Sequence, residues 1–264
     1  MTYTTVTDPA AVLALYDRRI RRDAVDHTPG NLVERVGDVV RFTGPDWNGV
    51  LWSGLDETTA DAAIAAEAAH FDALGVAAEW KLYSHDRPAD LADRLVAAGF
   101  VPEDEETLMV GAVTPLAVEP VLPEGVRIVD VTDAEGVALM DEAHRAAFGP
   151  GSADTRELLL RCLGQDTAAL TLAMAGDVPV SAARLEFHPG TGFAGLWGGG
   201  TVPEWRGRGV YRALVAHRAR LAAARGFQWL QVDAGAQSRP VLERLGFRAL
   251  ATTTPYVRPG ARRD

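Results

Sequence analysis

Cysteine is almost absent from this chain of 264 residues. Its single cysteine, Cys162, excludes an internal disulfide and fits a reducing compartment. No apolar run approaches the roughly 20 residues that cross a bilayer, and the first residues lack the basic segment and apolar core of a secretory signal. Neither the cysteine nor the histidines follow a metal-ligand spacing. We therefore expect a cytoplasmic protein with no metal and no membrane partner.

Basic charge is also scarce. The 26 lysines and arginines stand against 36 aspartates and glutamates, and the net charge is −10. Such a chain repels nucleic acid, so we expect no nucleic-acid partner. Its acidity favours cationic substrates such as amines, though only weakly. The hydrophobic content of 47% is typical of a soluble globular protein, and the length suits two domains of ordinary size.

Short segments recur in the same order in the two halves of the chain. The pairs are Val6-Thr7-Asp8 with Val131-Thr132-Asp133, Gly37-Asp38-Val39 with Gly176-Asp177-Val178, Gly49-Val50-Leu51-Trp52 with Ala194-Gly195-Leu196-Trp197, and Leu95–Phe100 with Leu242–Phe247. Their shared order favours a tandem duplication. A proline-rich segment at 114–125 disfavours helix and interior strand. We therefore predict a domain at 1–113, a linker at 114–125 and a second domain at 126–264.

The second half alternates strand and helix patterns. Strands are predicted at 126–131, 168–175, 178–187, 193–202, 228–233 and 249–257, and helices at 134–148, 156–163, 210–225 and 239–245. Turns at Gly176 and Gly190 predict hairpins, and a helix between two strands predicts a parallel crossover. The fold class is therefore α/β, with a mixed sheet.

The most informative segment is Arg206-Gly207-Arg208-Gly209-Val210-Tyr211, between a predicted strand and a predicted helix. Its glycines let backbone amides turn toward one point, and the helix start adds the positive end of the helix dipole. Three arginines, Arg206, Arg208 and Arg212, add charge. The segment has neither the G-x-G-x-x-G dinucleotide pattern nor the G-K-[ST] ending of a nucleotide P-loop. We interpret it as an anion site suited to a pyrophosphate.

The run from Pro203 to Leu214 resembles the R/Q-x-x-G-x-G/A signature of the GNAT acyltransferase superfamily. Arg206 and Gly209 match the signature, whereas Tyr211 replaces its final Gly or Ala. The segment Leu242–Phe247 is similar to the closing helix and Gly-Phe pair of that family. The resemblance covers about 126–260. It implies acetyl-CoA as cosubstrate and two tandem GNAT-like domains, each a mixed, mostly antiparallel sheet flanked by helices.

The resemblance also implies where acetyl-CoA binds. The three glycines 198–200 would splay their strand, and the pantetheine arm would pair with the backbone of Gly199, Gly200 and Thr201. A backbone N–H of the same strand would stabilise the oxyanion. The pyrophosphate would lie at the loop, where the implied binding residues are Arg206, Gly207, Arg208, Gly209, Val210, Tyr211 and Arg212. The ring of Tyr211 must then point away from the phosphates or stack near the cofactor.

The first half has the same frame without this loop. Gly75 follows Leu51 by 24 positions, whereas Gly226 follows Leu196 by 30. The missing residues fall where the arginine-glycine loop stands, and Asp56-Glu57-Thr58-Thr59 takes their place. Two carboxylates at that point would repel a pyrophosphate. We therefore expect a degenerate first domain that is structural or that walls one side of the acceptor site.

Two positions that carry catalytic groups in many relatives hold Gln231 and Leu242 here. Neither side chain transfers protons. The candidates for taking the proton of an amine are Glu186, in the hairpin strand beside the splayed strand, and Asp233, at the end of the strand across the opening. The alternative interpretation of Glu186 is a solvated strand carboxylate, and that of Asp233 is a cap or turn residue. Tyr256 is a candidate for protonating the thiolate, with a core tyrosine as its alternative.

We predict an acetyl-CoA-dependent N-acetyltransferase in which a small-molecule or peptide α-amine attacks the thioester directly. One alternative is a mycothiol-synthase-like acetyltransferase, which shares the tandem layout. The other is a non-catalytic acyl-CoA-binding or sensing protein, motivated by Gln231 and Leu242. The duplication fits a monomer, with a homodimer as the alternative.

Overall fold

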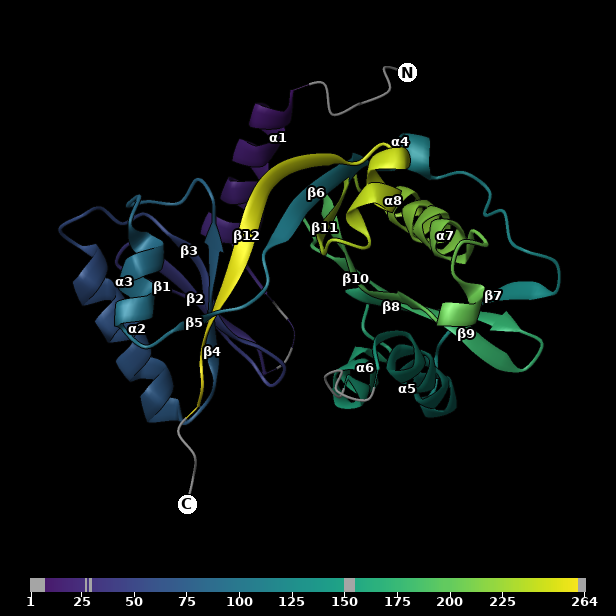
Figure 1. Ribbon diagram of the computed structural model, residues 1–264, viewed down its shortest axis with the longest axis horizontal. Coiled ribbons are helices and arrows are strands. Elements are labelled where there is room, and N and C mark those ends of the chain that lie inside the picture. Colours follow the sequence, from purple (N-terminus) through teal and green to yellow (C-terminus); the bar gives the residue numbers. More distant parts are fainter. Residues whose placement is uncertain (1–7, 27, 29, 150–154, 261–264) are drawn as a thin grey trace. The chain divides into compact units, whose positions relative to one another are not determined.

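The computed structural model describes residues 8–26, 28, 30–149 and 155–260. Contacts divide them into two compact units (Figure 1). The C-terminal unit consists of residues 109–232 and 240–248, and the N-terminal unit consists of residues 8–108, 233–239 and 249–260. No helix in the described ranges has the length and apolar character needed to cross a membrane.

The C-terminal unit is built on a mixed sheet. Its strands are β6 (Glu106–Ala112), β7 (Val126–Asp130), β8 (Ala168–Ala175), β9 (Val178–Phe187), β10 (Phe193–Thr201) and β11 (Trp229–Ala234), in the spatial order β6-β11-β10-β9-β8-β7. The pairs β7–β8, β8–β9 and β9–β10 are antiparallel, whereas β10 and β11 run parallel. The long crossover between β10 and β11 contains a helix, as a parallel connection requires.

Helices cover both faces of this sheet. Figure 1 places α5 (Ala134–Phe148) and α6 (Arg156–Cys162) on one face and α7 (Val210–Ala224) on the other. The Asp133 carboxylate caps α5 by accepting a hydrogen bond of 2.8 Å from the N–H of Gly136. One apolar core, with Met140 and Leu172, lies on the α5 side, and a second, with Val210 and Leu214, lies on the α7 side. A short helix, α8 (Arg239–Arg244), follows β11.

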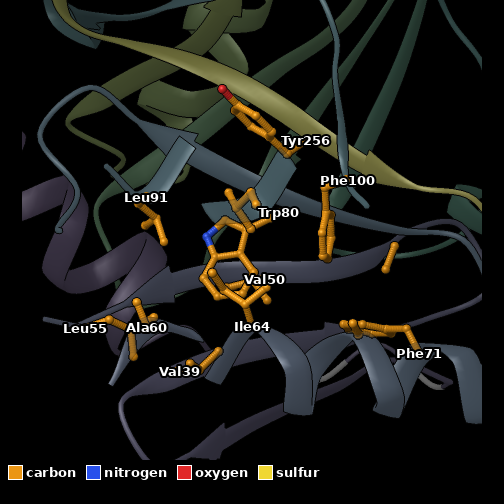
Figure 2. Close-up of a cluster of buried hydrophobic side chains, with 13 residues drawn as sticks. Val39, Val50, Leu55, Ala60, Ile64, Phe71, Trp80, Leu91, Phe100 and Tyr256 are labelled. Carbon is orange, nitrogen blue, oxygen red and sulfur yellow. The ribbon is translucent and has the colours of Figure 1, made fainter. Parts of the chain in front are cut away.

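The N-terminal unit repeats this arrangement with fewer residues. Its strands, β1 (Leu32–Val36), β2 (Val39–Thr43), β3 (Asn48–Ser53), β4 (Ala78–Tyr83) and β12 (Arg248–Arg258), are adjacent in that order, and β5 (Val101–Pro102) pairs with β12. Its helices are α1 (Pro9–Tyr16), the π-helical turn η1 (Asp17–Arg22), α2 (Ala60–Leu74) and α3 (Leu91–Ala97). Figure 2 shows the indole of Trp80 at the centre of its core, between Ile64 of α2 and Phe100.

Matching positions of the two halves have matching backbone conformations. Gly37 and Gly176 form hairpin turns with φ of 58° and 59°, and Gly99 and Gly246 precede a buried phenylalanine with φ of 88° and 98°. Each unit also has one parallel strand pair, β3–β4 and β10–β11. The predicted α/β class, with mixed and mostly antiparallel sheets, is confirmed. The Val6-Thr7 part of the first sequence match lies outside the described residues.

The compact units divide the chain differently from the predicted boundaries. Residues 249–258 of β12 belong to the N-terminal unit, where 253–258 pair with β4, whereas residues 109–112 of β6 lie in the C-terminal unit. The predicted boundaries assigned each of these segments to the half in which it stands in the sequence. The partner of a strand depends on tertiary contacts, which the local sequence pattern does not indicate. The boundaries 1–113 and 126–264 describe the two repeated halves of the sequence, which differ from the compact units, and they remain a prediction.

The predicted linker is partly helical. The short helix α4 (Val113–Leu116) begins it, and the side chains of Val113 and Leu116 are buried. Pro115 is the third residue of this helix. Proline is compatible with the first turn because the N–H groups there have no acceptor within the helix. The proline content of 114–125 therefore limited the helix to one turn without excluding it.

Candidate functional site

Strand β10 leaves its parallel neighbour shortly after the two strands meet. Only three residue pairs join them, ending with Gly195 opposite Gln231. On the other side of β10, the pairing with β9 continues through a β-bulge, in which Gly198 and Gly199 stand opposite the single residue Ala183. Gly198 has φ of 57°, which glycine adopts without strain. The sequence prediction of a splayed strand at the three glycines agrees with this geometry.

The arginine-glycine loop ends in the first turn of α7. Gly207 and Gly209 both have positive φ, 73° and 86°, and Gly209 is the residue that precedes the helix. No side chain caps this helix start. Val210 is 1% exposed and packs in the core, so the backbone N–H is the part of that residue suited to a ligand. The helix start therefore offers N–H groups and the positive end of a dipole to an anion.

The loop arginines have different positions. Arg206 donates to two backbone carbonyls, from Nε to Thr201 at 3.0 Å and from Nη2 to Ala147 at 2.7 Å. It therefore joins the end of β10 to the end of α5, and its predicted contact with a phosphate stays a prediction. The guanidinium of Arg208 lies 4.8 Å from the ring centroid of Trp205, and Arg212 is exposed.

Residues of the same chain occupy the space beside the splayed glycines. A Cβ on Gly199 would lie 3.0 Å from the ring of Tyr211, and one on Gly200 would lie 2.5 Å from the ring of Phe148. The Ser181 hydroxyl donates to the Gly200 carbonyl at 2.6 Å and lies 2.9 Å from the Thr201 hydroxyl. Glycine is thus needed here for internal packing, whereas the prediction explained it by the approach of the cofactor. The backbone role of these residues stays a prediction.

Comparisons with known proteins identify the family of this half. Residues 137–247 match the model of the acetyltransferase (GNAT) family. The C-terminal half belongs to the GNAT acetyltransferase family. No curated protein matches the chain as a whole or in part. Membership of the GNAT family indicates acetyl transfer in general, and the family uses acetyl-CoA.

Solved structures resemble the chain across both halves. A GCN5-related N-acetyltransferase from Kribbella flavida has a TM-score of 0.67 and 19% identity, over 96% of this chain and 95% of that one. A functionally unknown conserved protein from Staphylococcus epidermidis has a TM-score of 0.68 and 12% identity, over 89% and 96%. A tandem GNAT protein from the clavulanic acid biosynthesis pathway has 0.58 and 13%, over 96% and 88%. At such identities these likenesses establish the tandem GNAT fold alone.

The residues at the GNAT site fit acetyl-CoA in two respects. A strand edge diverges from its neighbour beyond Gly195, and an uncapped helix start follows a few residues later. The first suits an extended amide-containing chain and the second suits a phosphate group. In the described ranges no group of histidine, cysteine and carboxylate side chains is arranged to hold a metal ion.

Glu186 lies one strand away from the opening. It stands opposite Gly195 on β9, and Gly195 stands opposite Gln231 on β11, so the three share one face of the sheet. Its carboxylate Oε1 lies 3.0 Å from Nε of Arg184, and the side chain is 29% exposed. Glu186 therefore lies on β9, level with the point at which β10 and β11 part. Its carboxylate is in an ion pair that is partly accessible to solvent.

Asp233 lies in a buried ion pair. Its Oδ2 is 2.6 Å from Nζ of Lys81, the one lysine of the chain, and the Asp233 side chain is 3% exposed. Burial opposes the charge of Lys81, but Asp233, Glu79 and Tyr16 together outweigh it and raise the pKa of Lys81 above its usual range. By its contacts Asp233 belongs to the N-terminal unit. Tyr256, the predicted proton donor, is a core residue of the same unit (Figure 2).

The pKa of Glu106 is raised to near neutrality because its carboxyl is partly buried. Burial is the largest cause, Lys81 opposes it and Asp233 adds to it, and together they raise the pKa to about 7. A carboxyl whose pKa is raised on folding stabilises the fold at low pH, and this stability is lost as the pH rises from about 4.5 through about 7. We expect Glu106→Gln to be more stable than the wild type at pH 8, by on the order of 1–2 kcal/mol given the partial exposure of the side chain, and equally stable at pH 4.

Thermal unfolding at the two pH values measures this difference. The exposed neighbour Glu105 provides the control variant, Glu105→Gln, which we expect to show no pH-dependent change. A Glu106→Gln variant with the same pH dependence as the wild type would contradict the assignment.

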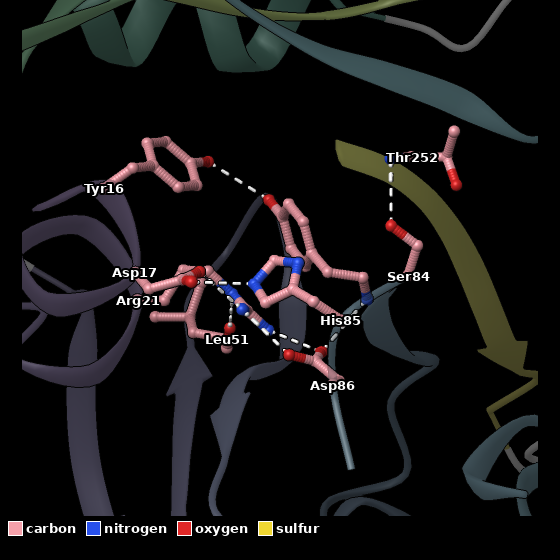
Figure 3. Close-up of polar contacts among 9 residues, drawn as sticks. Tyr16, Asp17, Arg21, Leu51, Ser84, His85, Asp86 and Thr252 are labelled. Carbon is pink, nitrogen blue, oxygen red and sulfur yellow. Dashed lines mark hydrogen bonds and ion pairs between the residues drawn. The ribbon is translucent and has the colours of Figure 1, made fainter. Parts of the chain in front are cut away.

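The N-terminal unit fills its own version of the opening with an arginine. Strands β3 and β4 are joined by two residue pairs and then part, as β10 and β11 do. Arg21 of η1 donates from Nε to the Leu51 carbonyl of β3 at 3.0 Å (Figure 3). Its guanidinium also pairs with Asp17 at 2.8 Å and Asp86 at 2.6 Å, and it is 2% exposed. A side chain thus bonds a strand carbonyl beside the point of divergence.

The helix start of this unit is also filled from within. The Asp56 carboxylate accepts hydrogen bonds of 2.9 Å from the N–H groups of both Thr58 and Thr59, immediately before α2. The threonine hydroxyls donate to the same oxygen, and these bonds together lower the pKa of Asp56 to about 2. Sequence reasoning expected Asp56 to repel an anion. The structure adds that its carboxylate occupies the N–H groups that an anion would need.

Arg218 was not among the residues predicted from the sequence. It follows Val210 and Leu214 at intervals of four on the apolar stripe of α7, and it is 1% exposed. That spacing was the available signal, because a charged residue on an apolar stripe needs a physical explanation. The preceding residue, His217, has its Nε2 3.0 Å from Asp130 Oδ1.

Proposed function

We propose that the C-terminal unit transfers an acetyl group from acetyl-CoA to an amine. The observation that carries this proposal is the divergence of β10 from β11 at Gly195, followed by an uncapped, glycine-preceded helix start at Val210. The first accommodates an extended pantetheine arm and the second a pyrophosphate. Acetyl-CoA, when bound, supplies an activated acetyl thioester.

The proposed contacts to acetyl-CoA are mainly backbone contacts. The N–H groups at the start of α7 hold the pyrophosphate, with Arg208 and Arg212 adding positive charge. Glycines at 207 and 209 turn the backbone toward the phosphates. Gly199, Gly200 and Thr201 present backbone groups to the pantetheine, and an N–H of β10 stabilises negative charge on the acyl oxygen. Arg206 supports the loop through Thr201 and Ala147.

Glu186 is the proposed base. An amine attacks only when it is neutral, so a group near the opening must accept a proton. Glu186 lies on the face of the sheet that α5 covers, as does the side chain of Ala182, which precedes it on the same strand with the same side-chain direction. Asp233 remains the second candidate, and its carboxylate is already engaged by Nζ of Lys81. The acceptor is proposed to be a small-molecule or peptide α-amine, in keeping with the net charge of −10.

A turnover assay tests the proposal. Purified protein with acetyl-CoA and a panel of amines should release free thiol faster than buffer does. We expect Glu186→Gln to lower kcat/KM by about 10²–10⁴ with an unchanged Kd for acetyl-CoA, because loss of a general base affects the chemical step alone.

The control is Glu142→Gln, which removes an exposed carboxylate on α5. Full activity of Glu186→Gln would move the assignment to Asp233, for which Asp233→Asn is the corresponding test. Tight binding of acetyl-CoA without release of thiol by any amine would favour a non-catalytic sensor. Acceleration by a cysteine-containing thiol precursor alone would favour a mycothiol-synthase-like activity.

A further inference from the structure

Arg218 lies directly beneath the bulge of β10. Its Nε donates to the Leu214 carbonyl at 3.1 Å, and its Nη1 donates to the Arg184 carbonyl of β9 at 3.1 Å. Arg184 stands opposite Trp197, the last residue of β10 before the bulge. Nη2 of Arg218 lies 3.6 Å from the point that a Cβ on Gly199 would occupy. One guanidinium therefore joins α7 to the strand that faces the bulge.

The charge of Arg218 has no carboxylate partner among the described residues. Its guanidinium donates to two backbone carbonyls and interacts electrostatically with Tyr211. Burial lowers the pKa of Arg218 to about 10, which leaves it charged at neutral pH. An unpaired buried charge costs several kcal/mol. A residue with this cost needs a compensating role.

Arg21 provides a comparison within the same chain. Both arginines are at most 2% exposed, and both donate to a backbone carbonyl of a strand near the place where parallel strands part. Arg21, in the half without the glycine loop, is neutralised by Asp17 and Asp86. Arg218, in the half with the loop, is not. The unpaired positive charge therefore occurs in the unit that is proposed to bind a polyanion and to develop negative charge on an acyl oxygen.

We propose that Arg218 is a positioning residue for acetyl transfer: it fixes the β10 bulge through the Arg184 carbonyl and keeps an uncompensated positive charge beneath Gly199. This inference rests on the proposed function of the same unit. The hydrogen bond holds the backbone groups of β10 in the bulged arrangement that they need for pairing with the pantetheine. The charge stabilises the anionic acyl oxygen through a region of low dielectric constant, where its effect is larger than in water.

Substitution of Arg218 by Met tests the proposal, because Met retains much of the volume and removes both the charge and the hydrogen bonds. Hydrogen exchange in the protein without acetyl-CoA should become about 10-fold faster at the backbone amides of 196–201. The Kd for acetyl-CoA should rise about 10-fold, and kcat should fall about 100-fold. Arg218→Lys, which keeps the charge and one hydrogen bond, should restore most of kcat and part of the exchange protection.

Arg220→Met is the matched control, since Arg220 lies on the same helix and pairs with Glu119 at the surface. Exchange and affinity in Arg218→Met equal to those of Arg220→Met would overturn the proposal. If Arg218→Met does not fold, the comparison passes to Arg218→Lys, for which wild-type exchange with wild-type kcat would overturn it. Hydrogen exchange is measured without acetyl-CoA, so it tests the effect of Arg218 on the bulge independently of binding. A wild type that binds no acetyl-CoA would contradict the proposed function and would not affect the exchange result.

Discussion

Gly209→Glu is expected to weaken acetyl-CoA binding at least 100-fold, which corresponds to about 2.7 kcal/mol. Gly209 has φ of 86°, a conformation that costs a residue with a side chain about 1–3 kcal/mol. The new carboxylate would also lie at the positive end of the α7 dipole, in competition with the pyrophosphate. Isothermal titration calorimetry with acetyl-CoA measures the effect directly.

The control for this variant is Gly190→Glu. Gly190 also has a positive φ, 77°, it is exposed in the turn between β9 and β10, and a Cβ there would meet no atom within 4 Å. The same chemical change is thus made at a similar backbone conformation away from the loop. We expect Gly190→Glu to bind acetyl-CoA like the wild type. Undiminished binding by Gly209→Glu would exclude the loop as the pyrophosphate site.

The same titration tests whether the N-terminal unit binds acetyl-CoA. Asp56 occupies the N–H groups before α2, and Arg21 occupies the Leu51 carbonyl of β3. Both groups that acetyl-CoA would need are thus satisfied by the chain itself. We therefore expect one molecule of acetyl-CoA per wild-type chain and no remaining site of wild-type affinity in Gly209→Glu.

Local signals in the sequence account for much of the fold of the C-terminal unit. The predicted helix at 134–148 is α5 with the same bounds, because Asp133 caps its start. The predicted hairpin at 168–175 and 178–187 has the same bounds as β8 and β9, because Gly176 takes a positive φ at the turn. Capping and turn residues act on their sequence neighbours, and their effect can therefore be read from the sequence.

Contacts between distant residues account for what the sequence did not reveal. The ion pair of Asp233 joins residues 152 positions apart, and no local pattern indicates Lys81 as the partner. Strand β12 pairs with β4, although the two strands stand in different halves of the sequence. The role of Arg218 likewise depends on a bulge in another element. The glycine loop located the proposed cofactor site, whereas the surroundings of each charged group required the three-dimensional structure.

The second large effect concerns the stability of the N-terminal unit. Arg21→Met should lower the free energy of unfolding by about 3–5 kcal/mol, because it leaves the Asp86 carboxylate buried without its cation. The Leu51 carbonyl would also lose its donor. The guanidinium further lies 3.9 Å from the ring centroid of Tyr83, and this contact would be lost as well. Urea denaturation at pH 7 measures the change.

Arg22→Met is the control for Arg21→Met, since Arg22 is the next residue of η1 and forms an exposed pair with Asp23. We expect this control to unfold at the wild-type urea concentration.

The loss of stability in Arg21→Met should depend on pH. Burial opposes the charge of Asp17, but hydrogen bonds from His85 and Arg21 outweigh it and lower the pKa of Asp17. A lowered pKa gives stability that is present above the unfolded-state pKa and lost as the pH falls through the folded-state value. The difference between wild type and Arg21→Met should therefore be largest near neutrality and shrink below about pH 4. A deficit that stays constant down to pH 3 would mean that lost packing, and not uncompensated carboxylates, destabilises the variant.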